Sequence, residues 1–526
     1  MARTHEKILA ARTGGRLKFA LAYPNAYRVG MSNLGIHIVY QIINADKNFS
    51  CERFFLPEHG QLLSVETQTP LNKFQVIGFA VSFEPDYFNV VKMLKIGKIK
   101  LRASERTDFD PIIIAGGPCA TFNPEPLSKI FDAFIIGEGE KILPPLLHEI
   151  ISSENLPRLQ RLEKLSQVAG VYVPAFPKKV SRQWVENLDE FPAHSTILTD
   201  DAEFNMYLIE TARGCGRHCR FCMAGYCFRR PRNRSLDVLK KEIVDAKSFG
   251  KKIGLMGAAI SDYPQIDALC KFILGAGLQM SVASFRADSV TEELVKSLAA
   301  SGLKTLTIAP EVGSEKMRRV INKGLTEENI FTAVELGLRA GLKNFRLYFM
   351  VGLPFEELAD VEEIARLTER IKKFCRGRLT LSVNPFVPKP FTPFQWSKFA
   401  DKKYLDAAFK ILRGSLKSLG GAQMISESLK SAQVQAILSR GDKKISEIIL
   451  HSETPQDFRK NFKAAGLDEE EYLRERSVDE ILPWDFLDQG FSKKYLIEEF
   501  NRARDLKSTP PCFDGCKRCG VCSVRS

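Results

Sequence analysis

The chain has 526 residues, which is enough for three or four domains at the usual size of about 100–200 residues each. Hydrophobic residues make up 44% and charged residues 26% of the sequence, a composition that excludes a disordered chain and indicates large buried cores. The net charge of +13 favours an anionic partner such as RNA, a phosphorylated substrate or a membrane surface, although a basic surface without a partner explains it equally well.

The 12 cysteines also limit the class of protein. No apolar run reaches the ~18 residues of a membrane-spanning helix, and the basic start lacks the apolar stretch of a secretory signal. We therefore expect a cytoplasmic protein without a membrane span, in which thiols stay reduced and bind metals rather than form disulfides.

Residues 1–155 are predicted to form an α/β domain with a doubly wound, parallel sheet, because short apolar segments alternate with helical patterns. Such sheets bind ligands beyond the carboxyl ends of their strands, where two glycine-rich turns lie: Gly116-Gly117 and Gly137-Glu138. Glycine lets a backbone approach a ligand closely, although each turn also has a purely structural explanation. The predicted strands cover 16–24, 51–57, 74–83, 111–117 and 132–140, and the helices cover 33–44, 86–97 and 140–150.

Residues 156–203 are rich in proline and charge and are predicted to be a linker. A second alternation of strands and helices begins after them. Residues 204–398 contain about six β/α units, fewer than the eight of a complete barrel. The predicted strands cover 206–211, 251–257, 278–285, 303–310, 345–352 and 378–385. In parallel barrels the chemistry lies on the loops that follow the strands.

A cysteine-rich loop follows the first of these barrel strands. Cys215, Cys219 and Cys222 have the spacing C-x3-C-x2-C, and Cys227 lies five residues further on. A structural zinc site needs four protein ligands, whereas three thiolates leave one position of a metal, or one iron of a four-iron cluster, without a protein ligand. Because Cys227 could be a fourth ligand, the spacing alone leaves both kinds of site open.

With the barrel rhythm, this loop resembles that of the radical S-adenosylmethionine superfamily, in which an aromatic residue, here Phe221, commonly precedes the last cysteine. The resemblance implies a four-iron, four-sulfur cluster held by Cys215, Cys219 and Cys222, the catalytic cysteines. Its unique iron binds S-adenosylmethionine, which is cleaved to a 5′-deoxyadenosyl radical. A reductant such as flavodoxin or ferredoxin is the implied electron source.

Further segments are similar to the cofactor-binding pattern of that superfamily. The turn that begins at Gly257 corresponds to a small-residue turn near the methionine amino group, but it lacks the commoner Gly-Gly-Glu sequence. Ser284 and Arg286 resemble a Ser-x-Arg segment of the methylthiotransferase-like branch, and Glu311 stands where a ribose-binding side chain is frequent. A Gly-Leu-Pro turn follows the fifth strand. Each segment could also be ordinary barrel packing.

Four arginines follow the cysteine loop: Arg229, Arg230, Arg232 and Arg234. Methylthiotransferases that modify tRNA or a ribosomal protein carry a similar stretch, so the resemblance implies that these residues guide an anionic substrate such as RNA. The alternative is that they pair with acidic residues of the barrel.

The N-terminal domain resembles the cobalamin-binding domain that precedes many barrels of this superfamily, on the basis of "IIIAGGPCATFNPEP" and "FDAFIIGEGE". Gly116, Gly117, Gly137 and Glu138 are therefore candidate cofactor-binding residues. The Asp-x-His-x-x-Gly segment, whose histidine ligates cobalt, is absent. Two interpretations stay open: cobalamin bound without a protein ligand to cobalt, which we favour, or a domain that has lost the cofactor.

Residues 399–505 are predicted to be a helical region, and residues 506–526 form a tail with a second set of cysteines. Cys512, Cys516, Cys519 and Cys522 could saturate a zinc ion or a second four-iron cluster. The dense spacing resembles bacterial ferredoxin motifs more than zinc ribbons, so the cluster is the favoured ligand.

The sequence thus predicts a radical enzyme of the transferase class. The leading hypothesis is modification of an unactivated carbon, with cobalamin-dependent methylation as its specific form. The second is sulfur insertion into RNA or protein in the methylthiotransferase style. The third is a non-catalytic iron–sulfur protein that binds RNA.

Overall fold

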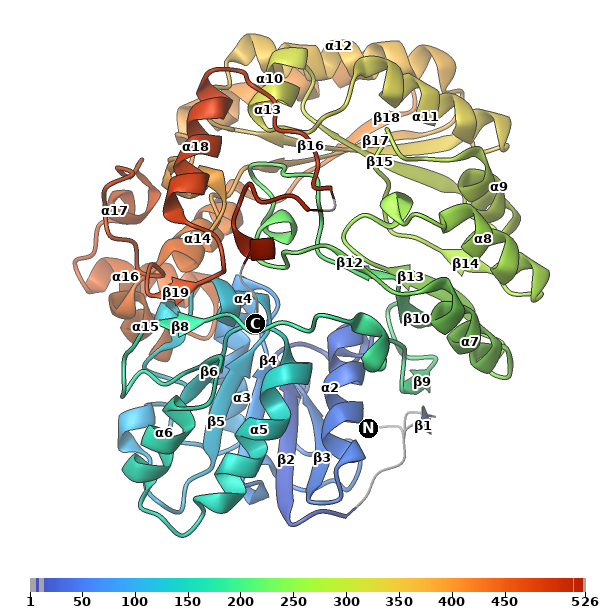
Figure 1. Ribbon diagram of the computed structural model, residues 1–526. Helices are drawn as coiled ribbons and strands as arrows, with labels where there is room; N and C mark the ends of the chain where they lie inside the picture. The colour runs from blue at the N-terminus through green and yellow to red at the C-terminus, as the bar shows by residue number, and fades with distance from the viewer. Residues whose placement is uncertain (1–5, 9–13, 514, 524–526) are drawn as a thin grey trace. The chain divides into compact units, whose positions relative to one another are not determined.

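The computed structural model describes residues 6–8, 14–513 and 515–523, so the predictions for the first domain and the tail extend beyond the described residues. The chain divides into two compact units (Figure 1). The first unit comprises Met1–Met206, Ile437–Tyr472 and Ile481–Gly490, and the second comprises Tyr207–Ala436, Leu473–Glu480 and Phe491–Ser526.

A six-stranded sheet forms the first unit, with strand order β3-β2-β4-β5-β6-β7. The first five of these strands run parallel, and β7 pairs antiparallel with β6. The parallel sheet is therefore confirmed, and its antiparallel edge is an addition that the sequence did not reveal. The strands are β2 (Leu17–Tyr23), β3 (Phe49–Phe55), β4 (Val76–Ala80), β5 (Ile112–Gly116), β6 (Ala133–Ile135) and β7 (Val171–Tyr172).

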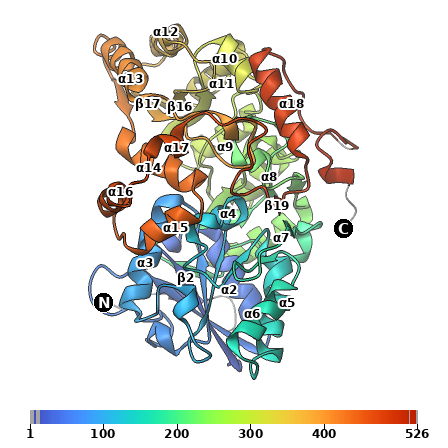
Figure 2. The ribbon, with the colours of Figure 1, turned by 90° about the vertical axis from the view of Figure 1, so that its left-hand side faces the viewer.

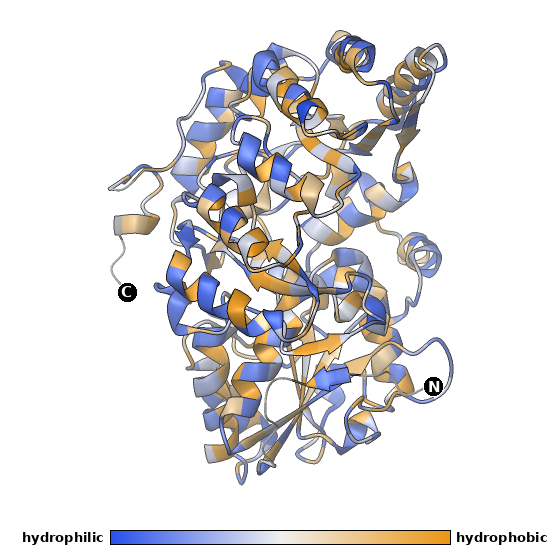
Figure 3. Ribbon diagram, turned by 90° about the vertical axis from the view of Figure 1, so that its right-hand side faces the viewer, coloured by the Kyte–Doolittle hydropathy of each residue, from blue (hydrophilic) through white to orange (hydrophobic). Residues whose placement is uncertain are grey.

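Helices cover both faces of this sheet, as Figure 2 shows for α3 on one side and α2, α5 and α6 on the other. Burial on both faces explains why the strands are almost continuously apolar; in Figure 3 they are largely orange, whereas the helices alternate orange and blue. Leu21, Tyr40 and Leu146 belong to the core on the side of α2 and α5. The helices are α1 (Tyr27–Gly30), α2 (Leu34–Ala45), α3 (Tyr87–Ile96), α4 (Pro118–Phe122), α5 (Gly139–Ser152) and α6 (Arg158–Ser166).

Residues 156–203, predicted to be a linker, are an integral part of the first unit. They supply α6, β7, β8 (Val180–Ser181) and β9 (Ile197–Thr199), and β9 pairs antiparallel with β1 (Glu6–Ile8). The guanidinium of Arg158 lies 2.7 Å from the buried carboxylate of Asp132, which ties α6 to the sheet. The proline and charged residues predicted the turns of this segment, but its short buried strands were not predicted.

The second unit contains the six predicted barrel strands. β13 pairs parallel with β14, and a parallel bridge from Phe285 to Ile308 connects the segment after β14 to β15. From β15 to β18 the strands are parallel neighbours in chain order. They are β10 (Met206–Glu210), β13 (Lys252–Met256), β14 (Met280–Ser281), β15 (Thr305–Glu311), β16 (Asn344–Val351), β17 (Leu379–Pro385) and β18 (Ala422–Ile425).

Along β15 and β16 every second residue is buried, and the residues between them are only half-buried. Because side chains alternate across a strand, one face packs on the covering helices and the other faces a less densely filled interior. The helices of this part are α7 (Leu236–Lys247), α8 (Ile266–Gly275), α9 (Glu292–Ala300), α10 (Glu315–Val320), α11 (Glu327–Arg339), α12 (Leu358–Phe374) and α13 (Lys402–Leu416).

The predicted helical region 399–505 is not one domain. Its first part completes the barrel sheet, because β18 pairs with β17. Residues 437–472 and 481–490 belong to the first unit, where the Asn123 amide donates to the carbonyls of Ser439 and Gly441, and β19 (Leu487–Asp488) pairs with β8. The helices are α14 (Leu429–Arg440), α15 (Lys443–Leu450), α16 (Pro455–Ala464), α17 (Glu469–Leu473) and α18 (Lys493–Arg504).

The Gly137-Glu138 turn is packed against its own chain. Gly137 has φ +125°, and a Cβ at this position would lie 2.0 Å from the Gln183 carbonyl oxygen. The Glu138 carboxylate accepts the Val185 amide at 2.9 Å. The close approach that requires glycine here is therefore to the segment around Gln183, and the structure favours the structural explanation of this turn over ligand binding.

In the part of the chain that the structure describes, no helix is both long enough and apolar enough to cross a membrane.

Gly137→Ala should destabilise the protein by about 2–4 kcal/mol, because it adds a side chain at positive φ against a fixed backbone. The matched control is Gly116→Ala at the neighbouring strand end, where an added Cβ would lie 3.7 Å from Ile135, an ordinary contact. The control should change stability by less than about 1 kcal/mol. Urea unfolding followed by circular dichroism measures both, and equal losses would contradict the packing explanation.

Candidate functional site

The cysteine loop follows β10, as predicted, and is closed at its base by β11 (Ala212–Arg213) pairing with β12 (Arg232–Asn233). Gly214 has φ +82°, and a Cβ there would lie 2.1 Å from the Phe228 carbonyl oxygen, so only glycine fits this turn. The loop is therefore fixed at its ends, although most of it has no regular secondary structure.

The three thiols of the motif are neighbours. Burial, and then the adjacent Cys219 thiol, raises the pKa of Cys215; burial together with Cys219 and Cys215 raises the pKa of Cys222 to about 12. A metal centre that binds them as thiolates must therefore supply positive charge. Cys227 is fully buried. Among the described residues, no three His, Cys, Asp or Glu side chains converge in the manner of ligands to a single metal ion.

Two cations lie beside these thiols. Arg286 donates from Nη1 to the Cys219 sulfur at 3.7 Å, and the charge of Lys323 acts to lower the pKa of Cys222. Arg286 was predicted to bind a cofactor, and its guanidinium already contacts Asp288 through Nε and Nη2 and the Lys323 carbonyl through Nη2. The guanidinium of Arg286 is therefore held between Asp288, the Lys323 carbonyl and the Cys219 sulfur.

Other predicted residues lie at the strand ends around the loop. Gly257 follows β13 and Ser284 follows β14, and both are exposed. Glu311 ends β15 with φ +71°, and its carboxylate contacts Lys323 at 2.9 Å. A non-glycine residue in this conformation costs about 1–3 kcal/mol and is frequent at functional sites. Phe221 is half-buried within the loop.

Three residues of the site were not predicted from the sequence: Lys323, His218 and Arg217. Arg217 forms ion pairs with Asp262 at 2.6 Å and with Asp288 at 2.9 Å, which joins the loop to the segments after β13 and β14. His218 and Arg217 lie between the cysteines, so their position in the motif was a signal. Lys323 had none, because it lies in an ordinary loop before Gly324.

The arginine-rich stretch is mostly directed inward. Arg229, Arg232 and Arg234 are buried, and only Arg230 is exposed. Arg234 pairs with Glu210 at 2.9 Å, and Arg229 donates to the Gly225 carbonyl at 2.6 Å. The prediction that all four arginines guide an anionic substrate is therefore wrong for three of them, and the alternative of internal pairing holds for Arg234.

The second cysteine set lies against the first loop. The Cys512 amide donates to the Gly216 carbonyl at 2.8 Å, and the Cys512 sulfur lies 3.1 Å from Nε2 of His218. Burial raises the pKa of Cys512 to about 11, with Arg229 lowering it and the thiols of Cys516, Cys519 and Cys522 raising it. The four tail thiols are therefore neighbours of one another.

The first unit has a polar edge where β2 and β4 end. The chain leaves β2 in one direction and β4 in the other, which is the switch point at which parallel sheets bind ligands. The Asn25 amide donates to the Asp86 carboxylate at 3.0 Å, and burial raises the pKa of Asp86 to about 6. Ser82 and Phe83 are exposed here, and Asn33 reaches Ser82 at 3.5 Å.

His37 is a buried histidine of the first unit. Its Nδ1 accepts the Thr196 amide at 3.2 Å, so Nε2 carries the proton and donates to the Met31 carbonyl at 3.1 Å. Both ring nitrogens are therefore engaged within the protein, and this imidazole is not available to a metal.

A cavity of about 280 Å³ lies at the Gly-Leu-Pro turn after β16. Glu356 lines it, and its Oε1 accepts the Gly352 amide and the Tyr404 hydroxyl, each at 2.8 Å. Burial raises the pKa of Glu356 to about 7, although these hydrogen bonds lower it.

Comparison with known families gives two matches. Residues 35–174 match the family described as "Radical SAM proteins, N-terminal", and residues 209–368 match the family described as "Radical SAM superfamily". The uncharacterized protein MJ0966 of Methanocaldococcus jannaschii is 32% identical over 442 residues, which cover 83% of this chain and 91% of that protein. A putative methylthiotransferase of the same organism, MJ0865, is 25% identical over 274 residues, 48% of this chain and 56% of that protein.

Two solved structures share the fold. The radical S-adenosylmethionine methyltransferase TsrM from Kitasatospora setae, solved with cobalamin and a [4Fe-4S] cluster, has a TM-score of 0.56 and 13% identity, covering 86% of this chain and 100% of that chain. The cobalamin-dependent S-adenosylmethionine radical enzyme OxsB, solved with aqua-cobalamin, has a TM-score of 0.50 and 17% identity, covering 86% and 62%.

Glu356→Gln should make the free energy of unfolding less dependent on pH between about 4.5 and 7. The folded-state pKa of Glu356 is raised, so the parent's contribution from this group is present below pH 4.5 and is lost as the pH rises to about 7. The free energy of unfolding of the parent relative to the variant should therefore fall over this range. The exposed Glu315→Gln is the control, and a constant difference for Glu356→Gln would refute the raised pKa.

Proposed function

Because the chain belongs to the radical S-adenosylmethionine superfamily, we propose that it methylates an unactivated carbon with cobalamin as the methyl carrier. Membership of this enzyme superfamily is established, and the methylation reaction is the proposal. The observation that carries it is the presence, in one chain, of the three-cysteine loop in the second unit and an open polar edge at the switch point of the first unit.

The residues around the loop fit the four-iron cluster and S-adenosylmethionine of this superfamily. Three neighbouring thiols, Cys215, Cys219 and Cys222, would bind three irons, and the adjacent cations Arg286 and Lys323 offset their negative charge. When bound, the cluster supplies the electron that cleaves S-adenosylmethionine reductively.

The strand ends beside the loop leave room for a ligand. Gly257 and Ser284 are exposed and lack bulky side chains, so they would accommodate the methionine part of S-adenosylmethionine. The Glu311 carboxylate, held by Lys323, would accept hydrogen bonds from a ribose. Arg217, paired with Asp262 and Asp288, keeps the loop at these strand ends.

The side chains at the edge of the first sheet are of the kinds that would bind cobalamin. The exposed aromatic ring of Phe83 beside the polar side chains of Ser82 and Asn33 suits a large ligand with apolar and amide surfaces. Because both nitrogens of His37 are engaged, cobalt would have no ligand from this imidazole. TsrM and OxsB, which were solved with cobalamin bound, support this assignment.

Sulfur insertion is the second candidate function, favoured by the match of 48% of the chain to a putative methylthiotransferase. Membership in an enzyme superfamily argues against the non-catalytic alternative. A low-potential donor such as flavodoxin or ferredoxin is the proposed reductant, and the net charge of +13 keeps an anionic substrate such as RNA in the proposal.

Changing Cys215, Cys219 and Cys222 together to Ala should remove one four-iron cluster and abolish 5′-deoxyadenosine formation, because the cluster would lose its three protein ligands. Iron analysis and chromatography of the products measure both quantities under anaerobic conditions. Cys227→Ala, in the same loop, is the matched control and should retain cluster and cleavage. If the triple variant still cleaves S-adenosylmethionine with dithionite, the assignment of the loop is wrong.

Ser82→Trp should reduce the retention of hydroxocobalamin at least tenfold, because the indole would fill the exposed strand end between β2 and β4. Ser104→Trp, on an exposed residue before β5 at the opposite edge, is the control and should bind like the parent. Gel filtration with cobalamin quantification measures retention. Paramagnetic resonance of the bound cob(II)alamin should lack histidine nitrogen splitting. A parent that retains no cobalamin would move the assignment to sulfur insertion.

A further inference from the structure

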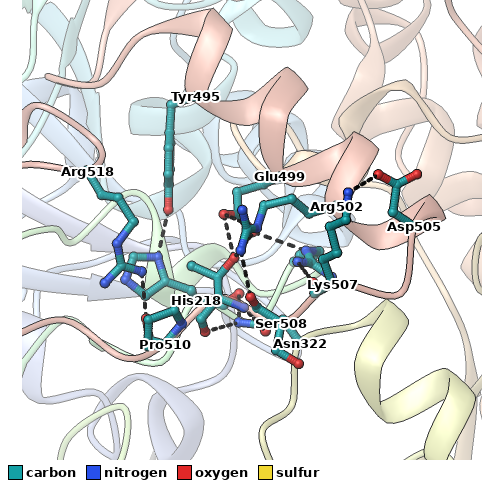
Figure 4. Close-up of polar contacts among 12 residues, drawn as sticks. His218, Asn322, Tyr495, Glu499, Arg502, Asp505, Lys507, Ser508, Pro510 and Arg518 are labelled. Atoms are coloured by element: carbon teal, nitrogen blue, oxygen red, sulfur yellow. Dashed lines mark hydrogen bonds and ion pairs between the residues drawn. The ribbon is translucent and has the colours of Figure 1, made fainter.

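The tail with the second cysteine set is fastened to the cysteine loop by buried polar contacts (Figure 4). The Asn322 amide donates to the carbonyls of His218 and Thr509 at 3.2 and 3.0 Å, and accepts the Thr509 amide at 2.8 Å. The Thr509 hydroxyl donates to Glu499 of α18 at 2.7 Å. Loop, barrel and tail therefore meet at fixed positions immediately before Cys512.

Cys512 is pressed onto the loop at Gly216. Its amide donates to the Gly216 carbonyl, and a Cβ on Gly216 would lie 3.2 Å from the Cys512 Cβ. This contact is tighter than a normal packing distance, so glycine at position 216 is what allows the two cysteine-bearing segments to approach. The approach is built into the loop itself, between Cys215 and Cys219.

His218 makes a hydrogen bond whose direction is determined by its neighbours. Nδ1 contacts the Tyr495 hydroxyl at 2.6 Å and the guanidinium of Arg229 at 2.5 Å. A guanidinium only donates, so Nδ1 is the acceptor and the proton of the neutral ring is on Nε2. Nε2–H therefore donates to the sulfur of Cys512 at 3.1 Å.

We propose that Cys512, Cys516, Cys519 and Cys522 bind a second four-iron cluster, which passes electrons to the cluster of the loop by way of His218. His218 is bonded through the backbone to Cys219 of the first set and through hydrogen to Cys512 of the second. When bound, the tail cluster would supply one electron at a time to the loop cluster, and a low-potential one-electron protein donor would replace that electron.

The exposure of the tail is consistent with electron entry from outside. Cys522 and Lys517 are exposed, whereas Cys516 and Cys519 are buried. The exposed Arg230, whose charge acts on the Cys522 thiol, suits an acidic electron carrier. The inference rests on the cluster of the cysteine loop and holds whether the subsequent reaction is methylation or sulfur insertion.

Hydrogen bonds to the sulfurs are among the factors that set the potential of an iron–sulfur cluster. A donated hydrogen bond stabilises the more negative, reduced state of a cluster, so the bond from His218 would raise the reduction potential of a cluster bound by the tail. His218 is thus a positioning residue, which acts through Cys512, and its loss should change the tail potential without removing either cluster.

The test compares His218→Met with His218→Gln, two side chains of similar size of which only Gln donates a hydrogen bond. Both variants should keep about eight irons per chain, the content of two four-iron clusters. Redox titration followed by paramagnetic resonance should give a more negative tail potential for the Met variant only. Its cleavage of S-adenosylmethionine with reduced flavodoxin should fall at least tenfold, and Gln should restore it. Unchanged potentials in both variants would overturn the role of His218.

A second experiment changes Cys512, Cys516, Cys519 and Cys522 to Ala, which should lower iron from about eight to about four per chain. This variant should still cleave S-adenosylmethionine with dithionite but lose cleavage driven by flavodoxin. Zinc in the tail of the parent, or undiminished flavodoxin-driven cleavage by the variant, would overturn the relay. If the parent itself fails to cleave with dithionite, the assignment of the loop fails instead.

Discussion

The rest of the second unit depends on the hydrogen bonds that one buried guanidinium of the cysteine loop makes to its surroundings. Arg220 is fully buried between two of the motif cysteines, and it donates to Glu499 of α18 at 3.1 Å and to the Lys507 carbonyl at 2.7 Å. It also donates to the carbonyls of Arg319 and Val320 at the end of α10. Because a buried charge without partners costs several kcal/mol, these segments must assemble around it. A loop without regular structure thereby acquires a fixed position.

The sequence was sufficient for the features that depend on local pattern. Apolar segments predicted the parallel strands β2 to β6, because a strand buried on both faces is largely apolar along its length. Apolar segments also predicted the barrel strands, of which β15 and β16 are fully buried on one face only. The spacing of Cys215, Cys219 and Cys222 predicted a metal-binding loop after the first barrel strand, and the structure brings these thiols together. Each of these two signals is contained within a few consecutive residues of the sequence.

Features that depend on distant partners were not predictable. The basic run at Arg229 and Arg234 looked like a surface, but its acidic and aromatic partners, Glu210 and Tyr495, are not adjacent in sequence. Gly137 looked like a ligand turn, because nothing marked Gln183 as the backbone that approaches it. β18 was hidden in a helical region, since four residues that pair with a finished sheet need no strong pattern of their own.

The contact between His218 and Cys512 joins residues that are 294 positions apart in the chain. A contact between residues so far apart in the chain has a large loop-closure entropy cost. We therefore expect it to form late in folding, after the local elements. The barrel strands can pair with their sequence neighbours while the thiols of the cysteine loop are still uncovered. We therefore expect an interval during folding in which iron and sulfide can reach Cys215, Cys219 and Cys222 before the tail packs against the loop.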